Sequence, residues 1–289
     1  MRWSSRRSPT TPRCSHGDTG VTVTITDAAD RRLDDYRSLN DQAFRRRYEA
    51  DRCFIVEGYV AIDRLIESGH TIRSVLLAPS RVDRFAGHAG TLGAADVPVY
   101  VADRDVIADV VGFDLHRGVI ACADRRPHPS IAQLTHDSRR IAVLEGLNDA
   151  ENLGAIARAA RAFGIDGLII DATCTDPYSR RTVRVSMGEV LTLPIARAGA
   201  DEWDDAADRL RADGFEVWAM TPEATADNVW ERPVPERLAV CLGAEGPGLS
   251  RTMLSGASHR VRIPISPAVD SLNVAQAAAV TFAATTRPA

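Results

Sequence analysis

Residues 143–164, VLEGLNDAENLGAIARAARAFG, join an apolar strand to an amphipathic helix through a short polar break. The run before the break is apolar, as a buried strand of a parallel sheet requires, and an Ala-rich stretch with helical periodicity follows it. We expect the helix to open on Asn152-Leu153-Gly154 and to carry Arg158 turned inward. Taken alone, Asn152 would be an ordinary N-cap and Gly154 a packing residue. The stretch therefore predicts a strand–helix unit whose polar break is a candidate ligand site.

Composition places the chain among globular proteins, because 45% of its 289 residues are hydrophobic and 26% are charged. All 35 basic residues are arginine. We attribute this to genomic base composition, although the planar guanidinium group also suits phosphate recognition. The net charge of the chain is −4, and neither 21–128 nor 129–289 carries a net positive charge. Any contact with nucleic acid must therefore come from a local patch.

Cysteine usage and hydropathy exclude several classes of protein. The cysteines are scattered and form no C-x-x-C pair, so they indicate neither a disulfide framework nor a metal site: Cys14, Cys53, Cys122, Cys174 and Cys241. No stretch approaches 18 purely apolar residues, which speaks against a membrane span. Residues 1–20 are rich in Arg and Ser without an apolar region. We interpret them as either a disordered extension or a wrongly assigned start, in a cytoplasmic protein.

The rest of the chain divides into two α/β units. Over 21–128, β-branched runs at 71–78, 97–102 and 118–123 alternate with amphipathic stretches such as 57–69, which predicts a small αβ domain. Prolines and polar residues then indicate a linker over 129–140. Residues 141–289 repeat the alternation.

The second unit has an expected order of strands and helices. Strands are expected at 141–147, 167–171, 215–220, 238–243 and 260–265, with helices from Asn152, over 201–214 and from about Ser271. The apolar strands predict a parallel sheet covered on both faces, which binds ligands at the carboxyl ends of its strands.

Two more strand ends carry unusual residues. The segment LGAEGPGLS (242–250) is either a plain turn or a Gly-rich loop whose amides can approach a ligand. It matches neither G-x-G-x-x-G nor a P-loop. The last strand leads through a Pro-bearing loop to Ser271-Leu272-Asn273, where Ser271 alone would be another N-cap. Because all three loops leave one edge of one sheet, we predict that they form a shared ligand site.

Together these three motifs identify a resemblance. N-x-G-x-x-x-R (152–158), G-x-E-G-x-G-L-S (243–250) and I-P…S-L-N-V-A (263–275) resemble, in this order, the SpoU/TrmH family of RNA 2′-O-ribose methyltransferases of the SPOUT class. The resemblance covers 141–289 and extends to DPYSRRTVRVSMGEVLTLP at 176–194. Residues 21–126 resemble, more weakly, a ribosomal-protein-like RNA-binding module. The resemblance implies a parallel-sheet α/β domain with a trefoil knot, preceded by a small αβ domain that binds the RNA substrate.

The same resemblance implies a cofactor and an assembly. The cofactor is S-adenosyl-L-methionine, held mostly through main-chain groups of six motif residues: Leu242, Gly243, Gly248, Ile263, Leu272 and Asn273. The assembly is a homodimer whose site draws on both subunits. A membrane partner and a metal ion are not implied.

The resemblance also assigns catalytic residues. Arg158 is the catalytic candidate, with Asn152, Glu245 and Asn273 organising it and the substrate. Because arginine is protonated under ordinary conditions, we expect Arg158 to grip the target phosphate and orient the hydroxyl rather than act as a base. The proton acceptor is not identified. Gln276 replaces a smaller residue that is usual in the third motif, so it is a candidate for altering the pocket wall.

Three arginines between the first two motifs are candidates for RNA contact. Arg180, Arg181 and Arg184 cluster beside the predicted ligand-bearing edge, and the alternative is a solvated charged face. Ribosomal RNA is preferred over transfer RNA as substrate because of the separate N-terminal module. Two other functions stay open: a catalytically inactive RNA-binding or ribosome-assembly protein, and a nicotinamide-dependent enzyme, which the missing G-x-G-x-x-G disfavours.

Overall fold

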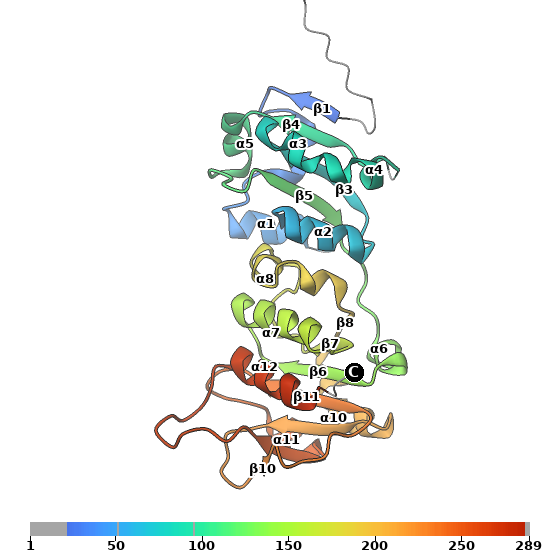
Figure 1. Cartoon of the computed structure of the whole chain (residues 1–289), viewed down its shortest axis with the longest axis vertical. Helices are drawn as coiled ribbons and strands as arrows, with labels where there is room; N and C mark the ends of the chain where they lie inside the picture. Colours follow the sequence, from blue (N-terminus) through green and yellow to red (C-terminus); the bar gives the residue numbers. More distant parts are fainter. Residues whose placement is uncertain (1–21, 51, 95, 287–289) are drawn as a thin grey trace, which may run out of the picture.

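A computed structural model describes residues 22–50, 52–94 and 96–286 (Figure 1). The extension predicted to be disordered, residues 1–20 with Cys14, lies outside the described residues. The N-terminal part contains β1 (Thr22–Ile25), η1 (Arg31–Tyr36), α1 (Gln42–Glu49), β2 (Cys53–Glu57), α2 (Tyr59–Ser68), β3 (Ile72–Leu77), η2 (Pro79–Arg81), α3 (Val82–Phe85), η3 (Ala86–His88), α4 (Ala89–Ala94), β4 (Val99–Ala102), α5 (Arg104–Val111) and β5 (Val119–Asp124).

The strands of this part form a mixed sheet in the order β1-β4-β3-β5-β2. β4 pairs in parallel with β1 and β3, whereas β5 runs antiparallel to β3 and β2. The predicted runs at 71–78, 97–102 and 118–123 form β3, β4 and β5, and the amphipathic stretch 57–69 forms α2. β1 and β2 were not predicted.

The C-terminal part begins with a helix and continues as alternating strands and helices. It contains α6 (Ile131–Asp137), β6 (Arg140–Glu145), α7 (Ala150–Ala162), β7 (Gly167–Ile170), α8 (Arg180–Val185), η4 (Glu189–Thr192), β8 (Ile195–Arg197), α9 (Ala200–Trp203), α10 (Ala206–Ala212), β9 (Glu216–Met220), β10 (Asp227–Asn228), β11 (Leu238–Gly243), α11 (Arg251–Gly256), β12 (His259–Arg262) and α12 (Val274–Thr285).

The predicted parallel sheet is confirmed. All pairs in the order β10-β12-β9-β11-β6-β7-β8 are parallel. Side chains of β6 alternate between two cores: Ala142 and Leu144 pack with α7 and α12, and Ile141 and Val143 pack with α6, α10 and α11. Each face of the sheet is therefore covered by helices, which explains why its strands read as unbroken apolar runs.

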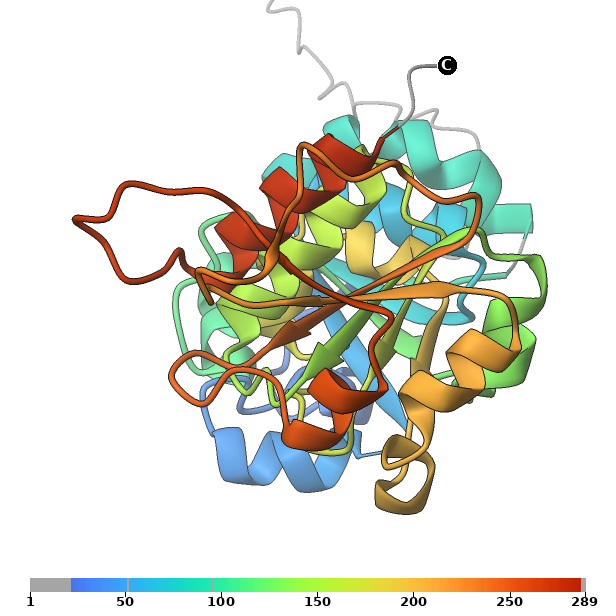
Figure 2. The same ribbon diagram turned by 90° about the horizontal axis from the view of Figure 1, so that it is seen from below.

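The strand order reverses next to β6. β7 and β8 extend the sheet on one side of β6, whereas β11 pairs with its other side, in register from Leu238↔Arg140 to Gly243↔Glu145. Such a reversal is the point at which open α/β sheets bind ligands. The segment between β12 and α12 also departs from this region and projects away from the body of the molecule (Figure 2). The trefoil knot implied by the resemblance remains a prediction.

Several boundaries differ from those predicted. The predicted linker over 129–140 is wrong for 131–137, because Ser130 opens helix α6 with a capping box and Ile131 and Leu134 pack into the second core. The helix predicted over 201–214 is two helices, α9 and α10. None of the helices in the described part of the chain has the length and apolar content needed to span a bilayer.

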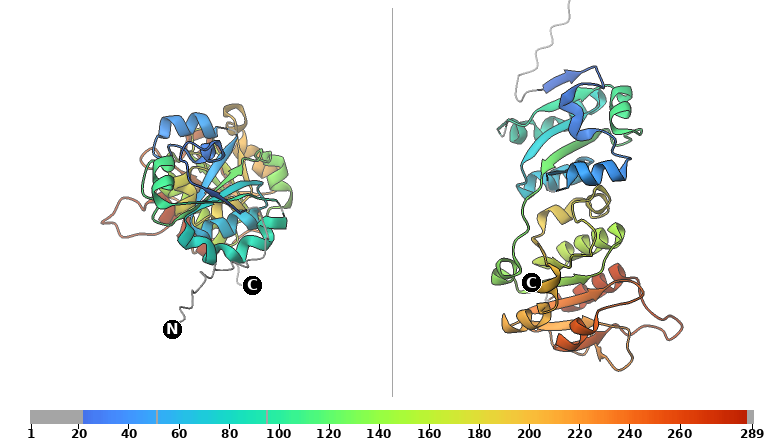
Figure 3. Two further views of the ribbon diagram at one scale, coloured as in Figure 1. Left: turned by 90° about the horizontal axis from the view of Figure 1, so that it is seen from above. Right: turned by 180° about the vertical axis from the view of Figure 1, so that it is seen from behind.

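The two parts pack through α8 and η4, which lie between the N-terminal sheet and α7 (Figures 1 and 3). Tyr178 stacks on Phe54 of β2 with ring centroids 5.0 Å apart, and on His128 at 5.7 Å. Arg125 binds both carboxylate oxygens of Asp176, at 3.0 and 2.5 Å. One continuous apolar cluster runs from β2 to α12, so the parts share a core.

Gly188 provides a test of this packing. It has φ +84°, and a Cβ there would lie 2.8 Å from Cα of Ala61 on α2. Gly188→Ala should lower the free energy of unfolding through both strain and overpacking, which costs about 1–3 kcal/mol. Gly164→Ala is the matched control, because Gly164 has φ +68° with open space around it. Urea denaturation should show the larger loss for Gly188→Ala, and equal losses would contradict the packing of the two parts.

Candidate active site

Three polar side chains from the three motifs meet at the reversal of the strand order. Asn273 Nδ2 donates to Glu245 Oε1 at 2.6 Å and to Asn152 Oδ1 at 2.9 Å. Asn152 Nδ2 donates to the same Glu245 oxygen at 3.1 Å. The prediction that the three loops share one site is supported by this closed set of contacts. We call Asn152, Glu245 and Asn273 the motif triad.

Each member of the motif triad is held by local backbone structure. Asp149, not Asn152, is the N-cap of α7, so the helix starts two residues before the predicted position and Asn152 lies in its first turn. Asn273, not Ser271, is the N-cap of α12: its Oδ1 accepts from the N–H groups of Ala275 and Gln276. The Asn273 amide therefore caps a helix with its oxygen and binds the other two motifs with its nitrogen.

Gly154 and Gly243 have different reasons to be glycine. A Cβ on Gly154 would lie 2.8 Å from Cβ of Val185, so Gly154 lets α7 approach α8 and the packing interpretation is confirmed. A Cβ on Gly243 would lie 2.2 Å from the carbonyl carbon of Gly248. The space that a side chain at Gly243 would need is filled by its own loop, and the main-chain contact of Gly243 with the cofactor remains a prediction. The loop 244–248 closes back on that space through the Ala244↔Gly248 bridge, and this places Glu245.

The other residues predicted to bind cofactor surround the same loops. Leu242 is buried at the end of β11, whereas Gly248 is exposed. Ile263 and Leu272 are half-buried at the two ends of the projecting segment. Within the described residues, the main-chain N–H and C=O of Leu272 have no hydrogen-bond partner. Gln276 is exposed in the first turn of α12.

Two carboxylates that the sequence analysis missed hold the loops in place. Glu145, the last residue of β6, accepts hydrogen bonds from the Trp203 indole and from the Ser250 N–H, both at 2.8 Å. Asp171 accepts from Gly146 N–H and from Thr173 Oγ1. Burial alone would raise the pKa of Asp171, but hydrogen bonds from Cys174, Thr173 and Gly146 outweigh burial and lower it. For both Glu145 and Asp171, the signal available in the sequence was an acidic residue at the end of a strand.

Arg158 does not join the motif triad within one chain. It is exposed, and in the described residues its side chain has neither a hydrogen bond nor an ion pair. The expectation of an inward side chain is wrong for this chain alone. Six residues turn an α-helix through about 600°, so Asn152 and Arg158 lie on different sides of α7. Any contact between Arg158 and the site must involve a second molecule or a bound substrate.

The three arginines predicted to form one RNA-binding patch have different surroundings. Arg181 pairs with Glu151 on α7. Arg180 turns toward the N-terminal part and lies over the ring of Phe113, 4.8 Å from its centroid. Burial lowers the pKa of Arg180, and its buried Nη1 has no hydrogen-bond partner among the described residues. Arg184 is half-buried with no ion pair among the described residues. They are therefore not a single solvated face.

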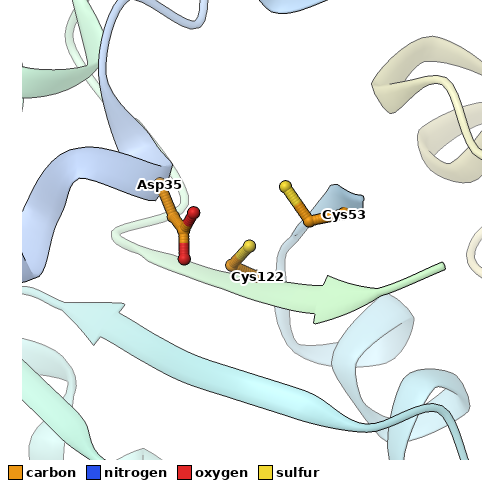
Figure 4. A group of neighbouring side chains, drawn as sticks. All are labelled: Asp35, Cys53 and Cys122. Carbon is orange, nitrogen blue, oxygen red and sulfur yellow. The ribbon is translucent and has the colours of Figure 1, made fainter. Parts of the chain in front are cut away.

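A separate cluster of ligand-type atoms lies in the N-terminal part (Figure 4). Atoms of Asp35, Cys53 and Cys122 lie within 4.8 Å of one another. The Asp35 carboxylate already accepts from the Tyr48 hydroxyl at 2.9 Å and pairs with Arg73 at 3.3 Å. A hydrogen bond with Cys53 and burial both raise the pKa of Cys122. Because the cluster has its own cation, we assign it a packing role.

The cysteines in the described part of the chain are buried free thiols: Cys53, Cys122, Cys174 and Cys241. This agrees, for that part, with the prediction that there is no disulfide framework. Burial, followed by the hydrogen bond with Asp171, raises the pKa of Cys174 to about 12. Cys174 therefore stays a thiol and supports the turn after β7.

Comparison with known proteins agrees with the observed fold. Residues 139–283 match the SpoU rRNA Methylase family. An uncharacterised tRNA/rRNA methyltransferase of Mycobacterium tuberculosis is 41% identical over 95% of this chain and 96% of the relative. A 23S rRNA (guanosine-2′-O-)-methyltransferase of Salmonella typhimurium is 25% identical over 78% of this chain and 95% of that protein.

A solved structure shows the same architecture. An AdoMet-bound rRNA methyltransferase from Sinorhizobium meliloti has a TM-score of 0.76 and 27% identity, covering 91% of this chain and 97% of that one. The fold is thus that of an RNA methyltransferase with a parallel α/β sheet. The chain belongs to the SpoU rRNA methylase family.

A double-mutant cycle tests the motif triad. Asn152→Ala and Asn273→Ala each remove hydrogen bonds, and Asn273→Ala also removes the cap of α12, at about 0.5–2 kcal/mol. The cap contributes equally on both sides of the cycle, so urea denaturation should give a coupling energy of about 0.5–1.5 kcal/mol. Asn152→Ala combined with Asn228→Ala, a residue of β10, should be additive. Additivity in the first pair would mean that the two amides do not interact.

Proposed function

We propose that this protein transfers a methyl group from S-adenosyl-L-methionine to a ribose 2′-hydroxyl of RNA, with ribosomal RNA preferred over transfer RNA. The observation that carries the proposal is the motif triad, in which the polar residues of all three family motifs meet at the strand-order reversal. The 2′-O specificity is supported by the similarity to the Salmonella typhimurium relative, a 23S rRNA (guanosine-2′-O-)-methyltransferase. We expect the reaction to take place in the cytoplasm.

The residues at this edge fit the proposed cofactor. The main-chain N–H and C=O of Leu272, which have no partner in the described residues, offer a donor and an acceptor to an adenine edge. They lie beside loop 244–248, which the Ala244↔Gly248 bridge closes. The half-buried Ile263 offers apolar surface nearby, and Leu242 and Gly243 are proposed to contribute main-chain groups. S-adenosyl-L-methionine supplies an electrophilic methyl group, so the protein has to align the hydroxyl and the methyl and assist loss of a proton.

Arg158 is proposed to act on the RNA. Its guanidinium is always charged and offers a planar fork of donors, which suits a phosphate next to the target ribose. Arg158 lies on a different side of α7 from Asn152, and its side chain is exposed. It is therefore available to the site of a second subunit. The proposed active site is therefore shared across a homodimer, with Asn152, Glu245 and Asn273 from one subunit and Arg158 from the other.

Two substitutions should separate chemistry from cofactor binding. Arg158→Ala removes an exposed side chain, so it should abolish methylation of unmodified ribosomal RNA while the affinity for S-adenosyl-L-methionine stays within a few-fold. Gly243→Val should lose the cofactor, because its side chain would displace the loop that carries Glu245. Gly87→Val, at an open position, is the control for the glycine.

Calorimetric titration and a methyl-transfer assay measure the two effects. Wild-type activity of Arg158→Ala at saturating cofactor would contradict the catalytic role. Binding of cofactor by the wild-type protein without any transfer to RNA would favour an inactive RNA-binding protein. Transfer to transfer RNA alone would overturn the preference for ribosomal RNA.

The shared site predicts a homodimer in solution. Light scattering at micromolar concentration should give about twice the 31.3 kDa of one chain. Equal mixing of Arg158→Ala with Asn273→Ala subunits should restore part of the activity, because one site of each heterodimer would then be intact. A monomer mass with full activity would exclude the shared site.

A further inference from the structure

The junction between the two parts of the molecule carries arginines whose charge is not neutralised locally. Arg117 precedes β5 in the N-terminal part, and Arg180 and Arg184 lie one turn apart on α8. Among the described residues, none of the three forms an ion pair. We call them the junction arginines. The whole chain has a net charge of −4, so this concentration is unlike the average surface.

Contacts place the junction arginines along one path. Arg180 lies over Phe113, which belongs to the same loop as Arg117, between α5 and β5. The Arg117 side chain covers Gly58, where a Cβ would lie 2.9 Å from Arg117 Cδ. Gly58 follows Glu57, whose charge acts on Arg180. The loop of the N-terminal part and the start of α8 are therefore direct neighbours.

The same end of α8 leads to the motif triad. Arg181, next to Arg180 in sequence, pairs with Glu151 on α7, and Glu151 immediately precedes Asn152. One short helix thus contacts the N-terminal loop through Arg180 and the entrance of the proposed active site through Arg181. This pairing assigns Arg181 a positioning role between α8 and α7 rather than a free phosphate contact.

The acidic groups nearby do not cancel the positive charge. Glu49 is already paired with Arg45 at 2.7 Å. Glu57 is 9% exposed, so it lies beneath the surface rather than facing an approaching ligand. Arg180 Nη1 is buried and has no hydrogen-bond partner in the described part of the chain, so no acidic group there neutralises it directly. Neither of the two acidic groups that act on Arg180 therefore faces an approaching ligand as an unpaired charge.

We propose that the RNA strand crosses this junction, with its phosphates bound by Arg117, Arg180 and Arg184, on its way to the motif triad of the same subunit. The inference rests on the proposed function and adds to it the route of the substrate. Arginine binds phosphate through a planar fork, and neutralising phosphates makes binding depend on salt. The N-terminal part would then hold the RNA in register with the reacting ribose.

A charge-matched pair of variants tests the route. The junction variant is Arg117→Ala/Arg180→Ala/Arg184→Ala. The control variant is Arg139→Ala/Arg209→Ala/Arg211→Ala, in which Arg139 lies at the opposite, amino-terminal edge of the sheet and the other two on exposed α10. The probe is ribosomal RNA transcribed in vitro, which carries no methyl groups. Affinity is measured between 50 and 200 mM salt, on the order of the range where phosphate contacts dominate.

The junction variant should bind RNA at least tenfold more weakly at low salt, with a salt slope lower by about one for each lost phosphate contact. Its affinity for S-adenosyl-L-methionine should equal that of wild type. The control variant should match wild type in RNA affinity. Because Arg180 is partly buried, Arg117→Glu, an exposed single change, serves as a second variant and should weaken RNA binding without changing the melting temperature.

Equal RNA affinity and slope for the junction and control variants would overturn the route, provided that wild type methylates the RNA. Loss of affinity in both variants alike would show only a non-specific effect of charge and would also overturn it. If wild type neither binds cofactor nor methylates RNA, the proposed function fails instead, and the cofactor titration separates these two failures.

Discussion

The parallel pairing of β6 with β11 is the constraint on which the site depends. β6 is followed in sequence by β7 on one side, and β11 joins its other side almost a hundred residues later. Their last residues, Glu145 and Gly243, lie opposite each other, so both strands release their loops at one point. The reversal leaves room between the two loops, and α12 enters there with Asn273 at its start. The motif triad follows from this arrangement.

Tight backbone packing then turns that arrangement into a defined geometry. Loop 244–248 folds back onto Gly243, so any side chain at this position would displace Glu245. Glu145 fixes the far end of the loop by accepting the Ser250 N–H, and Asp171 does the same for the turn after β6. The polar groups that would meet substrate and cofactor are thus held before either binds, which is the condition for catalysis by positioning.

The domain junction connects the N-terminal sheet to that geometry. Tyr178 and the Arg125–Asp176 pair join the N-terminal sheet to the segment before α8, and the apolar core is continuous across the junction. A connection of this kind would fix the distance between the proposed RNA contact on the N-terminal part and the target ribose. α8 is too short to be a stable isolated helix, and its position depends on packing from both sides.

The sequence by itself determined the class of fold and which three loops meet, whereas the function of that site stays a prediction. The apolar runs predicted the parallel strands, and three motifs at strand ends predicted that Asn152, Glu245 and Asn273 would come together. Local patterns failed where the decisive contact is distant. The prolines before helix α6 indicated a linker. The apolar residues that follow its capping box are buried only by contact with the second core, which local sequence does not reveal.

Tertiary structure alone decided where the arginines point and what the glycines meet. Arg158 reads as part of a catalytic motif, yet the turn of α7 carries it away from the motif triad. Arg180 and Arg181 are adjacent in sequence, but one faces Phe113 and the other Glu151, because neighbouring residues on a helix diverge by about 100°. Gly243 is enclosed by its own loop. The sequence shows which residues are present and how far apart they lie along the chain. The direction of each side chain and the identity of its neighbours are set only when distant segments pack together.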